Sequence, residues 1–139
     1  MTIKVARTDD LAACRTLRRT VFIEEQNVPE DLEVDGLDPT ALHLLATQEG
    51  RPVGTARLLV KGATGKIGRV CVLREERGRG IGAALIRKAV EELRDLGLET
   101  ARLGSQVHAI PFYEALGFAA EGPVYDDAGI PHRDMTLTL

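Results

Sequence analysis

Glycines alternate with other residues at Gly78, Gly80 and Gly82, and arginines stand beside them at Arg77 and Arg79. Glycine loses more conformational entropy on folding than any other residue, so glycines this close together indicate a backbone whose path a side chain would obstruct. A helix that begins at such a turn presents its first N–H groups, and the positive end of its dipole, to an anion. The residues predict a phosphate-binding turn, with a glycine-rich turn carrying solvated arginines as the plainer alternative.

A dinucleotide-binding site is a second interpretation, because Gly78, Gly80 and Ala83 match its G-x-G-x-x-A pattern. Such a site normally opens the first βαβ unit, and an acidic residue follows about 20 residues later at the end of the next strand. Here several predicted strands precede the motif, and Glu99 lies at the start of the next one. A nicotinamide-dependent dehydrogenase is therefore a distant alternative. No G-K-[ST] follows the glycines, which excludes a Walker P-loop.

The turn must be held by a strand before it and a helix after it, and the sequence supplies both. "KIGRVCVL" (66–73) is typical of a strand, and apolar residues recur on one helical face from Ile81 to Leu96, with Gly97 as the stop. The same patterns predict further strands over 2–6, 42–48, 53–60, 98–105 and 134–139, and helices over 8–26 and from Pro111 to Gly117. Thr8 or Asp9 is the expected N-cap of the first helix.

Turn signals at 49–52 and 61–65 join the three middle strands as antiparallel neighbours, and a polar stretch at 27–39 separates them from the first helix. This order predicts an α/β or α+β domain with a mixed sheet and helices on both faces. Its 139 residues suit a single domain, 1–139, and its 44% hydrophobic and 28% charged residues are ordinary for a globular protein.

The overall charge and the cysteines narrow the class of protein. The net charge of −3 provides no overall basic field for nucleic acid or for an anionic membrane. The N-terminus lacks the apolar core of a signal peptide, and no apolar run is long enough to span a bilayer. Cys14 and Cys71 stand apart without metal-ligand spacing, so no metal is expected. A cytoplasmic protein with reduced thiols is the expectation.

The glycine turn also carries a family resemblance. Arg77-x-x-Gly80-x-Gly82 matches the [QR]-x-x-G-x-[GA] signature of the GNAT superfamily of acyl-CoA-dependent N-acetyltransferases. An apolar strand precedes it and a long amphipathic helix follows, as in that family. "AIPFYEALGF" (109–118) resembles the second family motif, and the element order is similar over nearly the whole chain. "VFIEEQNVPEDLEVDGLD" (21–38) and "GIPHRDM" (129–135) look like a bacterial subgroup whose substrates are mostly undefined.

The resemblance implies a GNAT-like, mainly antiparallel mixed sheet and acetyl-CoA as co-substrate. The pyrophosphate of coenzyme A would lie on the turn, and the pantetheine arm would pair with the backbone at the end of the preceding strand. The implied cofactor-binding residues are Cys71, Val72, Arg77, Gly78, Arg79, Gly80, Ile81 and Gly82. Arg79 is equally well a solvated surface residue. The Cys71 side chain is better explained as a small apolar core residue than as a nucleophile.

Acyl transfer to an amine sets chemical requirements. A primary amine with a pKa near 10.4 must lose a proton before it attacks, and the departing thiolate benefits from a proton. A tyrosine is protonated at pH 7 and can donate to sulfur. Tyr113 occupies the matching position of the second motif, so it is the predicted general acid. The alternative is a tyrosine packed against the sheet with its hydroxyl bonded to backbone.

The base and the acceptor site are less defined by the sequence. A bound water or several side chains could act as base: Glu24, Glu25, Glu33, Asp35, Asp38, His43, His108 and His132. Glu25 and His132 are the predicted acceptor-side residues, and the acidic segment is equally a solvated surface loop. The leading function is direct N-acetylation of a primary amine on a small molecule or a protein. A non-catalytic acyl-CoA-binding or regulatory domain is the alternative, and a homodimer is compatible with the resemblance.

Overall fold

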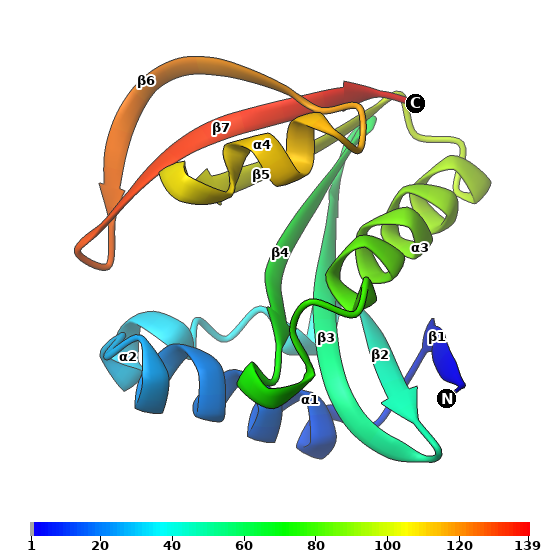
Figure 1. Ribbon diagram of the computed structural model, residues 1–139. Helices are drawn as coiled ribbons and strands as arrows, with labels where there is room; N and C mark the ends of the chain where they lie inside the picture. Colours follow the sequence, from blue (N-terminus) through cyan, green and yellow to red (C-terminus); the bar gives the residue numbers. More distant parts are fainter. Residues whose placement is uncertain (1) are drawn as a thin grey trace.

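The computed structural model describes residues 2–139. Their strands form one seven-stranded sheet in the order β1-β2-β3-β4-β5-β7-β6 (Figure 1). The strands are β1 (Ile3–Arg7), β2 (Leu42–Gln48), β3 (Arg51–Lys61), β4 (Thr64–Val72), β5 (Thr100–Gln106), β6 (Ala119–Asp127) and β7 (Ile130–Thr138). The α-helices are α1 (Leu11–Arg18), α2 (Glu30–Glu33), α3 (Ile81–Asp95) and α4 (Ile110–Glu114). A π-helix, η1 (Arg19–Glu25), extends α1, and single 3₁₀ turns are η2 (Asp38–Thr40), η3 (Arg74–Glu76) and η4 (Val107–Ala109).

The sheet splits between its two parallel strands. β4 pairs with β5 only where Thr64–Lys66 lies beside Thr100–Arg102, and all other neighbouring strands are antiparallel. Beyond that short ladder the two strands diverge, which separates an arm of β1–β4 from an arm of β5, β7 and β6 (Figure 1). The divergence leaves the β5-facing edge of β4 unpaired by any strand from residue 67 to residue 72. This open edge is the main structural consequence of the fold for the site.

Helices cover both faces of the first arm, as predicted. α3 places Leu85, Ile86 and Leu93 in the main core against β2 and β3. On the opposite face, Leu17 of α1 and Val21 of η1 form a second, smaller cluster with Cys71. Burial of these apolar faces, at about 25 cal/mol per Å² removed from water, holds the strand and helix on either side of the glycine turn.

Some local predictions need correction. The first helix is capped by Asp10, whose carboxylate accepts a hydrogen bond from the N–H of Ala13 at 3.1 Å, and not by Thr8 or Asp9. The Thr8 hydroxyl accepts from the N–H of Asp10 instead, at 3.1 Å, and so supports the cap from outside the helix. The polar stretch at 27–39 contains α2 and the start of η2, and β6 is a strand for which the sequence patterns indicate no bounds. Within residues 2–139, no helix is long and apolar enough to cross a membrane.

Candidate functional site

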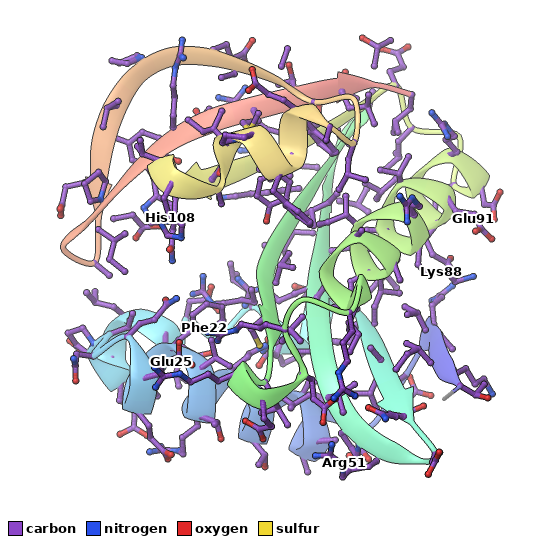
Figure 2. The ribbon with its side chains drawn as sticks, in the orientation of Figure 1. Phe22, Glu25, Arg51, Lys88, Glu91 and His108 are labelled. Carbon is purple, nitrogen blue, oxygen red and sulfur yellow. The ribbon has the colours of Figure 1, made fainter. Side chains whose placement is uncertain are left out.

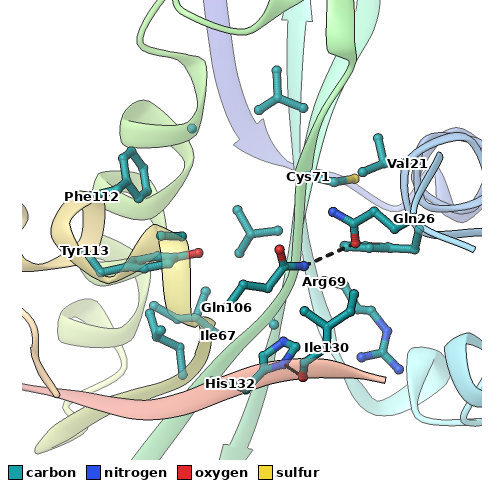
Figure 3. A pocket seen from close by; sticks show the side chains of 18 of the residues that line it. Val21, Gln26, Ile67, Arg69, Cys71, Gln106, Phe112, Tyr113, Ile130 and His132 are labelled. Atoms are coloured by element: carbon teal, nitrogen blue, oxygen red, sulfur yellow. Dashed lines mark hydrogen bonds between the residues drawn. The ribbon is translucent and has the colours of Figure 1, made fainter. Parts of the chain in front are cut away.

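A cavity of about 640 Å³ occupies the split between the two arms (Figure 3). Its walls come from η1, α2, β4, the start of α3, the end of β5, α4 and the β6–β7 hairpin. Most of the sequence-predicted residues line it together: Cys71, Val72, Arg77, Gly78, Gly80, Ile81, Gly82, Tyr113 and His132. Arg79 and Glu25 are not among the lining residues.

The glycine turn has the backbone that its composition indicates. Gly78 and Gly80 have φ angles of 81° and 79°, a left-handed conformation that side-chain-bearing residues rarely adopt. Gly80 is the N-cap of α3, and its carbonyl accepts from the N–H of Ala84 at 3.0 Å. A Cβ at either position would meet no atom within 4 Å. Glycine is therefore required there by the φ angle and not by a close protein neighbour. At Gly82 a Cβ would lie 3.4 Å from the Phe112 ring, so the start of α3 approaches α4 closely.

A β-bulge shapes the open edge of β4. Thr55 pairs with Cys71 but Arg57 pairs with Gly68, so β4 carries one more residue than β3 between these pairs. The extra residue allows Arg69 a φ of 52°, which is unusual for a side-chain-bearing residue. A bulge bends the strand that carries it, and this one lies in the part of β4 that no longer pairs with β5. Backbone groups along this edge that no strand pairs are therefore open to a ligand in the split, except the Val72 carbonyl, which accepts a hydrogen bond from Arg77.

Arg77 makes its strongest contacts within the protein. Its Nη1 and Nη2 donate to the two carboxylate oxygens of Glu25 at 2.7 and 2.8 Å, and its Nε donates to the Val72 carbonyl at 3.1 Å. The hydrogen bond from Arg77 lowers the pKa of Glu25 despite partial burial. The pair joins the end of η1 to the end of β4. Arg79 lies 3.3 Å from the Glu76 carboxylate, beside the turn but outside the cavity wall.

Tyr113 directs its hydroxyl into the cavity (Figure 3). Its ring packs edge-on against Phe112 and Phe118, with centroids 5.0 and 6.1 Å apart. Within residues 2–139 the hydroxyl makes no hydrogen bond, which differs from the packed, backbone-bonded tyrosine of the alternative interpretation. Burial raises the pKa of Tyr113 to about 12, so the phenol stays protonated at neutral pH.

Cys71 is buried, with only 5% of its surface exposed, in the cluster formed with Leu17 and Val21. Burial raises the pKa of its thiol to about 12. The thiolate is the nucleophilic form of cysteine, and at neutral pH this side chain is almost wholly the thiol. The prediction of a small core residue agrees with this environment, and Cys14 is likewise buried and free.

The acidic segment is largely engaged in ion pairs with arginines. Asp35 receives hydrogen bonds from Arg57 at 2.6 and 2.8 Å, which hold the pKa of its carboxyl far below the usual range. Burial opposes ionisation of Asp38, but hydrogen bonds from arginines, foremost one at 2.8 Å from Arg18, lower its pKa to about 2. Arg18 and Arg57 are 2% and 4% exposed, so these pairs anchor the segment to the core. Neither aspartate lines the cavity.

The histidines differ in their surroundings. His43 is buried, and its Nδ1 accepts from Arg18 at 3.1 Å while its Nε2 donates to the Asp38 carbonyl at 3.0 Å, so it belongs to the same network. His108 is exposed at the cavity rim and points toward the split (Figure 2). The His132 Nδ1 donates to the Ile130 carbonyl at 2.8 Å, which leaves Nε2 as the nitrogen able to accept a proton.

Several lining residues were not anticipated from the sequence, among them Gln26, Gln106 and Tyr125. The Gln106 Nε2 donates to the Gln26 Oε1 at 3.2 Å, and this bond crosses the split from β5 to the end of η1 (Figure 3). Tyr125 of β6 lines the cavity near the hairpin tip. No local spacing connects these residues, because the split sheet brings them together from distant parts of the chain.

Among residues 2–139 no group of three or more metal-ligating side chains is placed to hold an ion.

Comparison with known proteins assigns the chain to a family. Residues 8–139 match the model of the acetyltransferase (GNAT) domain. The chain therefore belongs to the GNAT acetyltransferase family, whose members transfer an acyl group from acyl-CoA. The recognition made from Arg77, Gly80, Gly82 and the second motif is confirmed, as is the mixed, mainly antiparallel fold.

Relatives and solved structures agree with this assignment. The chain is 37% identical over 143 residues to the uncharacterized protein YyaT of Bacillus subtilis, covering 100% of this chain and 97% of that one. It is 35% identical over 120 residues to the uncharacterized N-acetyltransferase YjcF of the same organism, covering 86% of each. An acyl-CoA N-acyltransferase from Pseudomonas aeruginosa superposes with a TM-score of 0.86 at 33% identity, covering 98% of both chains. Escherichia coli ElaA superposes with a TM-score of 0.88 at 30% identity, covering 98% and 99%.

Proposed function

We propose that the protein transfers the acetyl group of acetyl-CoA to a primary amine, by direct attack of the amine on the thioester. The observation that supports this most is a convergence on one cavity. A left-handed glycine turn, an unpaired strand edge and the hydroxyl of Tyr113 all face the same 640 Å³ space. These are the groups needed to hold a pyrophosphate, to align a polyamide arm and to protonate a leaving thiolate.

The polar backbone groups of the glycine turn and of the β4 edge suit the binding of coenzyme A. The N–H groups from Gly78 to Gly82 open α3 and would bind the pyrophosphate, since the first turn of a helix has N–H groups without intrahelical partners. Arg77 and Arg79 would add positive charge nearby. The backbone of Cys71 and Val72 would pair with the amides of the pantetheine arm along the open edge of β4.

In the proposed reaction the amine nitrogen forms a bond to the acetyl carbon and the carbon–sulfur bond breaks. The nitrogen loses its proton to a base, and Tyr113 gives its phenolic proton to the departing sulfur and regains one from solvent. The Tyr113 phenol is protonated at neutral pH, so the proton is in place before the sulfur leaves. His132, through Nε2, or a bound water is the proposed base. Asp35 and Asp38 are disfavoured as bases because arginines hold their oxygens.

The direct route is favoured over a covalent acyl-enzyme by the state of Cys71. A buried thiol whose pKa is about 12 offers almost no thiolate to a thioester at neutral pH. Intact-mass measurement after incubation with acetyl-CoA alone should show no acetylated protein, and Cys71→Ala should keep amine-dependent turnover. A stable acetyl adduct on Cys71 would contradict the direct route.

The decisive experiment measures free coenzyme A released from acetyl-CoA with and without a panel of primary amines. We expect release only with an amine, and acetyl-CoA should raise the melting temperature while NAD does not, because a ligand bound only to the folded state stabilises it. Binding of acetyl-CoA without release across the panel would favour a non-catalytic acyl-CoA-binding domain instead.

A cytoplasmic location, a single domain over 1–139 and a homodimer are further proposals. Two free, buried cysteines suit a reducing compartment. Light scattering coupled to gel filtration measures the oligomeric state directly.

A further inference from the structure

The end of the cavity remote from the glycine turn has its own chemical character. The β6–β7 hairpin tip reaches across the split toward η1 and α2, on the far side of the cavity from the start of α3 (Figure 1). With coenzyme A on the turn and the β4 edge, this end remains for the acceptor. Apolar or aromatic side chains line this end, Phe22, Val28, Leu32, Tyr125, Ile130 and His132, together with the polar Gln26, Gln106 and Arg69.

Few carboxylates are available there to a highly charged acceptor. Asp35 and Asp38 lie outside the cavity wall and are bound by arginines. Glu33 does line the wall, and its Oε1 lies 3.9 Å from the Arg69 Nε without a hydrogen bond, so this carboxylate can still receive one ammonium group. Asp127 is the remaining acidic residue at this end. A polyamine or an aminoglycoside carries more ammonium groups than these two carboxylates can match, so some would lose their hydration without finding an anion.

Tyr125 forms a fixed aromatic wall. Its hydroxyl donates to the Asp134 Oδ1 at 2.7 Å, and its ring stacks on the His132 ring with centroids 6.0 Å apart and an interplanar angle of 24°. A side chain at Gly104 of β5 would collide with the Tyr125 hydroxyl, so the glycine permits the tyrosine to cross that strand. A ring held in this way stacks on a flat ligand with little further loss of entropy.

The apolar side chains at this end remain partly exposed. Leu32 is 52% exposed and Tyr125 is 37% exposed, and both line the cavity. Apolar and aromatic side chains that line a concave site suit a ligand with apolar surface. Leu32 comes from α2 and Tyr125 from β6, so a ligand between them contacts both sides of the split.

We propose that the acceptor is a monoamine on a flat, apolar body, an arylalkylamine, which stacks on Tyr125 and contacts Leu32 with its amine directed inward toward Tyr113. This inference rests on the proposed function but concerns only the acceptor end. Tyr125 and Leu32 would then determine which amines are accepted, whereas Tyr113 and the glycine turn would serve any acceptor.

The test compares phenethylamine with spermidine and kanamycin by titration calorimetry on protein saturated with coenzyme A, so that it does not depend on turnover. We expect phenethylamine to bind at least about tenfold more tightly than either polycation. Tyr125→Ser should weaken phenethylamine by about fivefold, the scale of one aromatic contact. Tyr125→Phe, which keeps the ring, should retain most of the affinity.

Val124→Ser is the matched control, because Val124 is the preceding residue of β6, is 58% exposed and does not line the cavity. It should leave all affinities unchanged. Tighter binding of a polycation, or equal loss in Tyr125→Ser and Val124→Ser, would overturn the inference. If phenethylamine binds selectively but no coenzyme A is released in the turnover assay, the inference about the acceptor end is upheld. Only the proposed reaction would then be contradicted.

Discussion

The two ends of the cavity are built in different ways. At the cofactor end, the β4 edge, the glycine turn and the start of α3 come from one continuous stretch, 67–82, and Tyr113 is added from α4. At the acceptor end, the walls come from η1, α2 and the β6–β7 hairpin, which are distant in the chain. The cofactor end therefore depends on local backbone geometry, whereas the acceptor end depends on ion pairs and strand pairings that hold separate segments in place.

The largest effect should come from Tyr113, which serves the chemistry at the meeting point of the two ends. Tyr113→Phe removes one oxygen and keeps the ring contacts with Phe112 and Phe118. If the phenol protonates the leaving thiolate, kcat and kcat/KM should both fall by roughly 10²–10⁴, the range for general acid catalysis. Steady-state kinetics with an accepted amine measures this. Acetyl-CoA affinity should be unchanged, and unchanged turnover would show that Tyr113 only packs.

A second prediction concerns the ion pairs that anchor the acceptor end. Asp35→Asn leaves the nearly buried Arg57 with less compensation, so the free energy of unfolding should fall by about 2–3 kcal/mol, near the lower end for a broken buried pair. Asp9→Asn, at an exposed position outside this network, is the control and should change stability little. Urea denaturation measures both, and equal stabilities would show that the pairs contribute nothing.

The same network predicts a pH dependence. The pKa of Asp38 is about 2 in the folded protein, below the ordinary value of about 3.9 in an unfolded chain. Its stabilising contribution is therefore fully present above about pH 4 and is lost as the pH falls through about 2. Wild-type stability should decline between these values, and Asp38→Asn should decline less over the same interval. Thermal melts at several pH values measure the stability of both proteins. If the stability of Asp38→Asn falls as steeply with pH as that of the wild type, the low pKa of Asp38 does not cause the decline.

Gly80→Val tests the local geometry of the cofactor end. A β-branched residue strains at φ 79°, and relief of that strain would turn the N–H groups of α3 away from the pyrophosphate, with a loss of coenzyme A affinity of about tenfold. Gly97→Val is a matched control, because Gly97 has φ 77°, equally open space and a position at the other end of α3. Both variants should lose similar stability in a thermal melt. Only Gly80→Val should lose coenzyme A affinity in calorimetry. Equal affinities of the two variants would show that the glycines only form a turn and do not help to bind the cofactor.

The smallest effect sharpens the role of Arg77, which joins the two ends through Glu25. If Arg77 acts by direct contact with phosphate, Arg77→Gln should weaken coenzyme A by several-fold and Glu25→Gln should not. If its main role is the bidentate pair, both variants should leave coenzyme A affinity nearly unchanged. They should then increase hydrogen exchange in η1, and the double variant should be no worse than either single one. Calorimetry and exchange mass spectrometry separate the two roles.

Much of the cofactor end could be predicted because its determinants are local. The alternation in 66–73, the glycines at Gly78 and Gly80 and the apolar face of α3 each specify the backbone within a few residues. The predicted strands and long helices are present, with ends displaced by a few residues. The N-cap was misplaced because Thr8, Asp9 and Asp10 all have side chains that can cap, and only the helix axis selects among them.

The sequence by itself determined the order of elements, the glycine turn, the family and Tyr113 as the tyrosine of the second motif. Tertiary structure decided which carboxylates are available, because Asp35 and Asp38 meet Arg57 and Arg18 only after β3 and α1 pack together. It also decided that Gln26 meets Gln106 and that Tyr125 faces the cavity, since both depend on the divergence of β4 from β5. Periodicity encodes which face of an element is buried, but the partner of a polar side chain depends on contacts between segments far apart in the chain.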